Sequence, residues 1–173
     1  MNRLDEFLKG IDGIEFEKTS DTDIERLKKV FSGKMPDMLL EVFAEHAPAE
    51  DIDFGDFVFY GIERIIDENT DYIPGANISP FGLFTFASTF EGDAIVFDSN
   101  VPDYPVYQCS HSLLEDEEEI FFSKRGKMQS LSFSYENIIK VSARLAVSFD
   151  EFVTNLLNGN AGTYTVTDML EDL

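Results

Sequence analysis

The sequence predicts an α+β fold with a single, mostly antiparallel sheet of about five to six strands and flanking helices at the N- and C-terminal ends. Three observations lead to this prediction. Helical patterns fill the first part of the chain, short strand-like segments follow, and another helical pattern comes near the end. Helices grouped before and after the strands, rather than alternating with them, are typical of an α+β domain. The 173 residues are enough for one domain with a sizeable core.

Three helices are predicted in the first 50 residues. The first covers residues 1–11, the second begins at Thr22, and Pro36 suits the first turn of the third. Thr22 and Glu25 form a capping-box pattern. Each helix has an apolar stripe: Leu4, Phe7, Leu8 and Ile11 in the first; Ile24, Leu27, Val30 and Phe31 in the second; Leu39, Leu40, Phe43 and Ala47 in the third.

Short strands are predicted in the middle of the chain, separated by turn residues. They cover residues 57–60, 82–87, 94–98, 104–109, 118–123 and 130–135. The last of these alternates strictly, as a half-buried strand does. Residues 62–69 predict a brief helix and residues 77–82 a loop, whereas residues 138–147 fit either a helix or a strand.

A final helix is predicted after Ser148, which is its N-cap, with Glu151 at the capping-box position. Its apolar stripe consists of Phe149, Phe152, Val153, Leu156 and Leu157. Gly159 suits the C-terminal cap. The predicted domain therefore covers residues 1–158, and residues 159–173 are a tail or a docked extension of the same domain.

The charge of the chain excludes several classes of function. It carries 34 Asp and Glu against 13 Lys and Arg, a formal net charge of −21. Such a chain is unsuited to nucleic acid or to anionic membranes, because phosphates are bound by clustered Lys and Arg. Two interpretations of the charge remain open: solubility alone, or rapid capture of a basic partner.

Compartment and topology are also predicted from composition. No apolar run approaches the roughly 20 residues that cross a bilayer, and the acidic N-terminus does not resemble a signal peptide. A single cysteine, Cys109, excludes an internal disulfide. We therefore expect a soluble protein of a reducing compartment, the cytoplasm.

Acidic residues cluster around the stretch from Phe84 to Asn100. Glu91 and Asp93 flank Gly92, and Asp98 begins the next turn. Strands on both sides predict a hairpin connection in which Gly92 adopts an unusual backbone angle. We interpret these carboxylates as parts of turns rather than as a site.

Two further acidic clusters are candidates for binding a partner. One surrounds Gly55 and faintly resembles the start of a calcium loop, but position 62, where the loop needs a glutamate, is Ile62, so no calcium site is predicted. The other is a run of like charge, which fits either a partner surface or a protected strand edge. The candidate partner-binding residues are Glu115, Asp116, Glu117, Glu118, Glu119, Asp51, Asp53 and Asp56.

Residues capable of nucleophilic chemistry are few. Cys109 and His111 lie two positions apart, so on a strand they would share a face and could pair as thiolate and imidazole. No third, orienting group is identifiable, and the other histidine, His46, suits the end of a helix. The sequence predicts no catalytic residue, no cofactor and no metal ligand, and therefore no enzyme.

Four segments together resemble the SUKH superfamily, which joins a fungal cell-wall-synthesis regulator with many bacterial immunity proteins. They are "TDIERLKKVFSGKMPDMLLEVFAEHA", "PFGLFTFASTFEGDAIVFD", "PVYQCSH" and "VSFDEFVTNLL", in the family's order between Thr22 and Asn158. The chain departs from the family pattern in having no Trp, and residues 1–15 and 159–173 lie outside it.

The resemblance implies an α+β fold without enzymatic activity. It implies that Gly92 and Asp93 form a scaffold turn, and that the chain binds a cognate toxin, often a nuclease or deaminase. A nuclease needs a positive surface, towards which an acidic protein would be steered. The alternative that the resemblance offers is a regulatory or scaffold module like the fungal relatives. Oligomeric state stays open, because the strand "LFTFA" could be central or could pair with a second copy.

Overall fold

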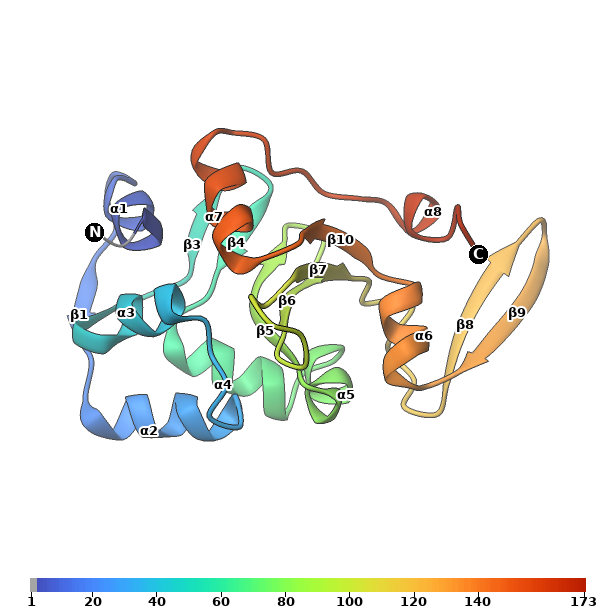
Figure 1. Cartoon of the computed structure of the whole chain (residues 1–173), viewed down its shortest axis with the longest axis horizontal. Coiled ribbons are helices and arrows are strands. Elements are labelled where there is room, and N and C mark those ends of the chain that lie inside the picture. The colour runs from blue at the N-terminus through green and yellow to red at the C-terminus, as the bar shows by residue number, and fades with distance from the viewer. Residues whose placement is uncertain (1–2) are drawn as a thin grey trace.

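The computed structural model describes residues 3–173 and confirms the α+β prediction (Figure 1). Its main sheet has six strands in the order β10-β7-β6-β5-β4-β3, and each neighbouring pair is antiparallel. The strands are β3 (Ile52–Phe54), β4 (Phe57–Phe59), β5 (Leu83–Thr89), β6 (Ala94–Asp98), β7 (Val106–Cys109) and β10 (Ala143–Ala146). The "LFTFA" strand is therefore central, between β4 and β6.

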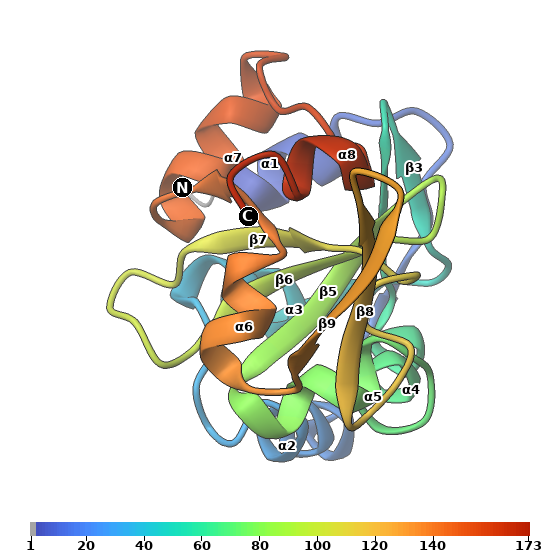
Figure 2. The same ribbon diagram turned by 90° about the vertical axis from the view of Figure 1, so that its right-hand side faces the viewer.

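Helices flank the sheet, and two short strand pairs lie outside it (Figures 1 and 2). The helices are α1 (Arg3–Lys9), α2 (Asp21–Val30), α3 (Asp37–Glu45), α4 (Ile62–Thr70), α5 (Gly75–Ile78), α6 (Tyr135–Lys140), α7 (Phe149–Leu157) and α8 (Val166–Met169), with a 3-10 turn η1 (Ser79–Phe81). The extra pairs are β1 (Phe16–Lys18) with β2 (His46–Pro48), and β8 (Glu119–Lys124) with β9 (Lys127–Ser132).

The first face of the sheet carries a core rich in phenylalanine. Side chains of α1, α2, α3 and α7 pack there against alternate residues of the strands. The rings contact one another closely: Phe86, for example, lies 5.8 Å from Phe152 and 5.2 Å from Phe149, measured between ring centroids. Burial of large aromatic surfaces is the main source of stability on this face.

The second face is covered over β5, β6 and β7 but less completely over β4, where Val58 is half-buried. Val96 and Cys109 on this face lie beneath Ile120 and Phe122 of β8 and beneath Ile138 of α6. The C-terminal segment adds Leu170 to the same cluster. Over β4 and β5 the second face borders a groove, described below.

Residues 159–173 contact the sheet through both backbone and side chains. The side chain of Gln108 in β7 donates to the carbonyl of Tyr164 and accepts from its N–H, both at 2.8 Å. Before this segment, α7 ends in a Schellman motif: Gly159 has φ 67°, and the N–H of Asn160 donates to the carbonyl of Asn155. The segment is docked along the sheet and ends in α8.

The second helix begins two residues earlier than predicted. Its N-cap is Ser20, whose Oγ accepts from the N–H of Asp23, and Asp23 completes the capping box in place of Glu25. Thr22, the predicted N-cap, lies inside the first turn instead.

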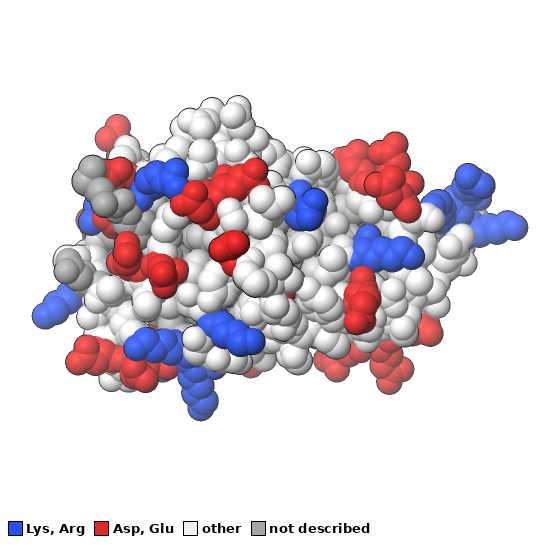
Figure 3. Space-filling model, viewed as in Figure 1, with Lys and Arg blue, Asp and Glu red and all other residues white. Residues whose placement is uncertain are grey.

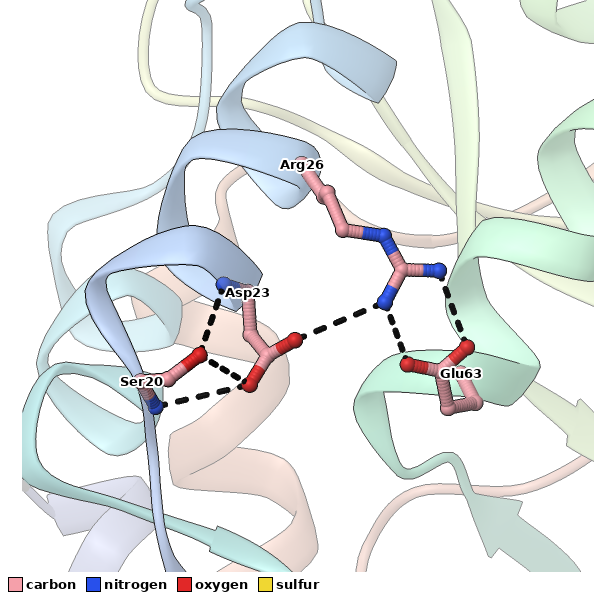
Figure 4. A network of polar contacts seen from close by, with 4 residues as sticks. All are labelled: Ser20, Asp23, Arg26 and Glu63. Carbon is pink, nitrogen blue, oxygen red and sulfur yellow. Dashed lines mark hydrogen bonds and ion pairs between the residues drawn. The ribbon is translucent and has the colours of Figure 1, made fainter.

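A contact between α2 and α4 is shown in Figure 4: Arg26 of α2 pairs with both carboxylate oxygens of Glu63 in α4, at 2.5 and 2.9 Å. The Arg26–Glu63 pair is largely exposed, so it orients the two helices more than it stabilises them.

Other predicted boundaries also differ. The third helix ends at Glu45, so Ala47 lies in β2, and His46 is extended (φ −142°) and pairs with Lys18. Residues 77–82 contain helical turns rather than a loop, and residues 138–147 contain both the end of α6 and β10. On α7, Leu157 is exposed although Phe149, Phe152 and Val153 are buried.

The strand predicted at 130–135 is β9, which ends at Ser132 and is mostly exposed. It belongs to a two-stranded pair whose outer side meets solvent, so its alternation does not mark a strand of the main sheet. The first predicted helix corresponds to α1, and residues 1–2 of that prediction lie outside the described residues.

Candidate partner-binding site

A groove of about 560 Å³ lies beside the β4–β5 end of the second face. We define the groove by six of the side chains that line it: Tyr60, Arg64, Glu68, Tyr72, Phe90 and His111. They come from the end of β4, from α4 and the loop after it, from the turn after β5, and from the segment after β7. The groove is therefore assembled from parts of the chain that are far apart in sequence.

Helix α4 is held against β5 by a buried asparagine. Asn69 Nδ2 donates to the carbonyl of Thr85 at 2.8 Å, and Asn69 Oδ1 accepts from the Thr85 N–H at 2.8 Å. The loop after α4 then returns very close to the helix: a Cβ at Gly75 would lie 2.1 Å from the carbonyl oxygen of Glu68. These contacts place Arg64, Glu68 and Tyr72 in fixed positions at the groove.

Arg64 is held in one orientation by three neighbours. Its guanidinium carbon lies 5.4 Å from the ring centroid of Tyr60 and 5.1 Å from that of Tyr72. Its Nη2 pairs with Glu68 Oε1 at 2.7 Å, although the side chain of Glu68 is only 7% exposed. Burial raises the pKa of Glu68, and the positive charge of Arg64 opposes that shift. The result is a pre-oriented guanidinium with about half of its side chain accessible.

Large apolar side chains are exposed at the rim of the groove. Tyr72 is 48% exposed, Ile73 40% and Phe90 61%. A scattered exposed apolar residue is normal on a soluble protein, but a group of them marks an interaction surface. Tyr and Arg are also the residues most enriched at the energetic centres of protein interfaces.

The acidic cluster of the β3–β4 hairpin borders this groove. Asp53 pairs with Val58 across β3 and β4, and Val58 lines the groove, so Asp53 lies on the same face of the sheet. Asp51 lines the groove directly, and its Oδ1 accepts from the N–H of Gly61 at 3.0 Å. The carbonyl of Asp56 accepts from the N–H of Phe90. The structure therefore places Asp51, Asp53 and Asp56 beside the aromatic rim.

The acidic run from Glu115 to Glu119 lies elsewhere, in the loop that leads into β8 (Figure 1). All five side chains are exposed. Asp116 has a structural role as well: its Oδ1 accepts from the N–H groups of Glu118 at 2.7 Å and Glu119 at 3.0 Å, which lowers the pKa of Asp116. The structure thus separates the candidate residues into two groups, of which one adjoins the groove.

The carboxylates near Gly92 serve the scaffold. Asp98 is fully buried and accepts from Tyr135 Oη at 2.5 Å and from the N–H of Asn100 at 2.9 Å. Asp93 accepts from Gln108 Nε2 at 2.8 Å and from the N–H of His111 at 3.0 Å. Gly92 has φ 92°, as the hairpin connection requires.

Cys109 and His111 do not form a reactive pair. Cys109 is fully buried in β7 with its Sγ 3.3 Å from Ser142 Oγ, and burial raises the pKa of its thiol to about 12. His111 follows the strand, is exposed and lines the groove. The thiol therefore stays protonated at neutral pH and is enclosed away from the imidazole.

Residues 3–173 contain neither a cluster of metal ligands nor a membrane-spanning helix. No group of three or more His, Cys, Asp or Glu side chains in this range is arranged to hold a metal ion. No helix in the same range has both the length and the apolar character required to cross a membrane.

Of the six groove residues, the sequence singled out only His111, and it did so as a possible partner of Cys109 rather than as part of a groove. The one local signal was the spacing of Arg64 and Glu68, which are four apart on a predicted helix and bear opposite charges. The contributions of Phe90 and His111 depend on chain reversals that no spacing reveals. No protein-family model, curated protein or solved structure matches the chain.

Proposed function

We propose that this chain is a non-enzymatic binding protein that captures a basic protein partner at the groove and its acidic edge. The observation that carries the proposal is the arrangement of Tyr72, Phe90 and the pre-oriented Arg64 beside Asp51, Asp53 and Asp56. Exposed aromatic residues supply contact area at a small entropic cost, and pre-orientation reduces the loss of freedom on binding.

Electrostatics supports a basic partner. The chain has a net charge of −21, and its Lys and Arg are too few to neutralise the carboxylates. A field of this sign steers a positive protein towards the surface and speeds association. Proteins that act on nucleic acids carry such positive surfaces, because they must hold phosphates.

The resemblance to the SUKH superfamily suggests the biological form of this binding. We propose an immunity protein that neutralises a cognate toxin, a nuclease or a deaminase, in the cytoplasm of the cell that makes the toxin. The four SUKH-like segments and the excess of acidic residues both fit this role. A regulatory module of the fungal kind would fit the same segments without a toxin partner.

The proposal is tested by co-expressing the chain with the product of the adjacent gene and scoring growth of the host. Rescue from a toxic product supports an immunity role, and a non-toxic product that binds supports the regulatory alternative. The contact surface is tested by measuring association rates over a salt series for Asp53→Asn/Asp56→Asn and for Glu117→Gln/Glu118→Gln/Glu119→Gln. Asp51 is left unchanged because it supports the backbone at Gly61.

We expect the Asp53/Asp56 variant to associate more slowly and with a shallower dependence on salt, because steering by these charges is screened over about 8–10 Å at physiological ionic strength. The Glu117–Glu119 variant serves as the control, since it removes three carboxylates, one more than the Asp53/Asp56 variant, from a surface away from the groove. Slower association and a shallower salt dependence in the Glu117–Glu119 variant, with no change in the Asp53/Asp56 variant, would instead place the contact on the loop before β8.

A further inference from the structure

The β8–β9 hairpin forms a two-stranded sheet of its own and projects at one end of the molecule (Figures 1 and 2). Its turn contains Arg125 (φ 52°) and Gly126 (φ 73°), as in a two-residue hairpin loop. In the described part of the chain, β9 pairs with β8 alone. Along β9 only Leu131 is partly buried, and the other residues are exposed. The hairpin therefore presents an open strand edge.

The register shows which backbone groups face this open edge. Phe133 donates its N–H to the carbonyl of Glu118, directly beyond the pair Glu119 and Ser132. Because hydrogen-bonded and non-hydrogen-bonded pairs alternate in an antiparallel ladder, the N–H and C=O groups of Met128, Ser130 and Ser132 point away from β8. The Ser132 carbonyl already accepts from Asn137 Nδ2 at 2.9 Å, although a carbonyl oxygen has room for a second donor.

The two ends of the hairpin carry opposite charges. Lys124, Arg125 and Lys127 surround the turn, and Figure 3 shows basic side chains at that end, with other basic and acidic groups interspersed over the rest of this face. These three cations form no ion pair within residues 3–173. The other end of the hairpin begins at the exposed acids Glu117, Glu118 and Glu119.

We propose that β9 pairs antiparallel with β9 of a second copy of the chain, centred on Ser130, to make a four-stranded sheet. In this arrangement each basic turn lies at the same end of the sheet as the acidic start of the other hairpin, with one strand between them. A parallel arrangement would bring like charges together, so the charges select the antiparallel one. The pairing would satisfy the outward N–H and C=O groups of Met128 and Ser130, which otherwise leave an edge open to uncontrolled pairing.

Exposed apolar side chains extend along the same surface. Phe121 pairs with Ser130 across the hairpin, and Met128 is two residues from Ser130, so all three lie on its outer face. Phe121 is 47% exposed and Met128 73%. Pairing of two copies would unite these side chains in one patch and shelter part of it.

The net charge of each copy opposes association, but the location of the hairpin limits that repulsion. The hairpin lies at one end of the long axis, so the two acidic bodies extend away from the contact (Figure 1). Repulsion between exposed charges is screened over about 8 Å at physiological ionic strength, whereas the opposite charges at the hairpin ends are only two strand spacings, about 10 Å, apart and carried on long side chains. The proposal does not depend on the proposed function, because no groove residue belongs to the hairpin.

The first test is the molar mass by light scattering over a series of protein concentrations. Wild type is expected to rise towards twice the 19.6 kDa of one chain. Ser130→Pro removes an outward N–H without touching the ladder to β8, and it is expected to weaken dimerisation at least tenfold. Ser130→Ala keeps the N–H and is the matched control, expected to dimerise as wild type does. Circular dichroism establishes that both variants are folded.

The second test exchanges the charges at the hairpin ends. Lys124→Glu/Lys127→Glu and Glu118→Lys/Glu119→Lys are each expected to be monomeric alone and to form a dimer when mixed, because the mixture restores opposite charges at both contacts. Arg125 is left in place because of its positive φ. A wild type that stays monomeric throughout, a dimer that survives Ser130→Pro, or a mixture that fails to associate would each overturn the proposal.

Discussion

The two faces of the main sheet differ in how completely they are covered. On the first face, helices α1, α2, α3 and α7 enclose a continuous aromatic core. On the second face, the β8–β9 hairpin, α6 and the C-terminal segment cover β6 and β7, and the groove borders β4 and β5. The first face therefore holds the fold together, while the second leaves room for a partner.

Buried polar groups occur on both faces of the sheet. On the second face Asp98 accepts from Tyr135 Oη, and on the first face Gln108, which lies opposite Ile95 of the aromatic core, donates to Asp93. Buried polar groups fix geometry because each requires its own hydrogen bonds. The comparison suggests that stability and binding can be changed separately, and four sets of variants test this.

The largest expected effect is on the first face. Phe152 is 2% exposed and lies against Phe57 and Phe86, so Phe152→Ala should lower the free energy of unfolding by about 3–5 kcal/mol. Leu157→Ala, on the same helix but 42% exposed, is the matched control and should change it far less. Denaturant titration measures both. Equal losses in the two variants would contradict the assigned core face of α7.

The second-largest effect tests whether the part of the second face over β6 and β7 is closed to solvent as completely as the first face is. The thiol of Cys109 ionises near its ordinary pKa of 9.0 when unfolded, but burial raises its pKa to about 12 in the folded protein. The unfolded state therefore loses this proton first, and stability falls as pH rises from about 9 towards 12.

At pH 10 the loss from this one thiol is about 1.4 kcal/mol, the free energy of one pKa unit. We expect the unfolding free energy of wild type to fall more steeply than that of Cys109→Ala between pH 8 and pH 10, by about that amount. Parallel curves for the two proteins would show that the thiol is accessible to solvent.

The third effect compares the helix caps of the two faces. Ser148 Oγ accepts from the N–H of Glu151 at 3.0 Å, and Ser148→Ala should lower the free energy of unfolding by about 1 kcal/mol. Ser134 caps α6 on the second face through a longer contact of 3.4 Å to the N–H of Asn137, so Ser134→Ala should have a smaller effect. Thermal denaturation of both variants distinguishes them, and the opposite order would refute this ranking.

The smallest effect on stability is expected at the groove. Tyr72 is 48% exposed, so Tyr72→Ala should change the free energy of unfolding by no more than about 0.5 kcal/mol. The same variant should speed dissociation of the partner, since exposed aromatic anchors contribute strongly to interfaces. Tyr60→Ala is the comparison, because Tyr60 is 5% exposed and should affect folding. Unchanged dissociation in Tyr72→Ala would remove Tyr72 from the proposed site.

Local sequence signals correctly predicted the elements that are stabilised by interactions between residues close together in the chain. Helix α7 is the clearest case: Ser148, the apolar spacing from Phe149 to Val153, and Gly159 all act within a few turns of one another. The start of α2 was wrong by two residues because Ser20 and Thr22 both head plausible capping patterns. Helix α2 uses Ser20 and Asp23, and from the same helix Arg26 reaches Glu63 on α4.

The position of β9 was predicted within a few residues, but its environment was not. Alternating side chains predict a strand with two unlike faces, and they do not indicate how many strands accompany it. The same limit applied to the acidic clusters. Asp51 and Glu115 looked equivalent in sequence, yet one borders an aromatic groove and the other leads into a projecting hairpin.

The amino-acid sequence by itself determined the α+β class, the capped C-terminal helix and the strongly acidic character, because these follow from composition and from interactions between residues near in the chain. Only the tertiary structure decided that Arg64 is held between Tyr60 and Tyr72, that Phe90 joins them, and that Cys109 is enclosed. Those features depend on contacts between distant segments, whose geometry is set by packing around the sheet and leaves no periodic trace in the sequence.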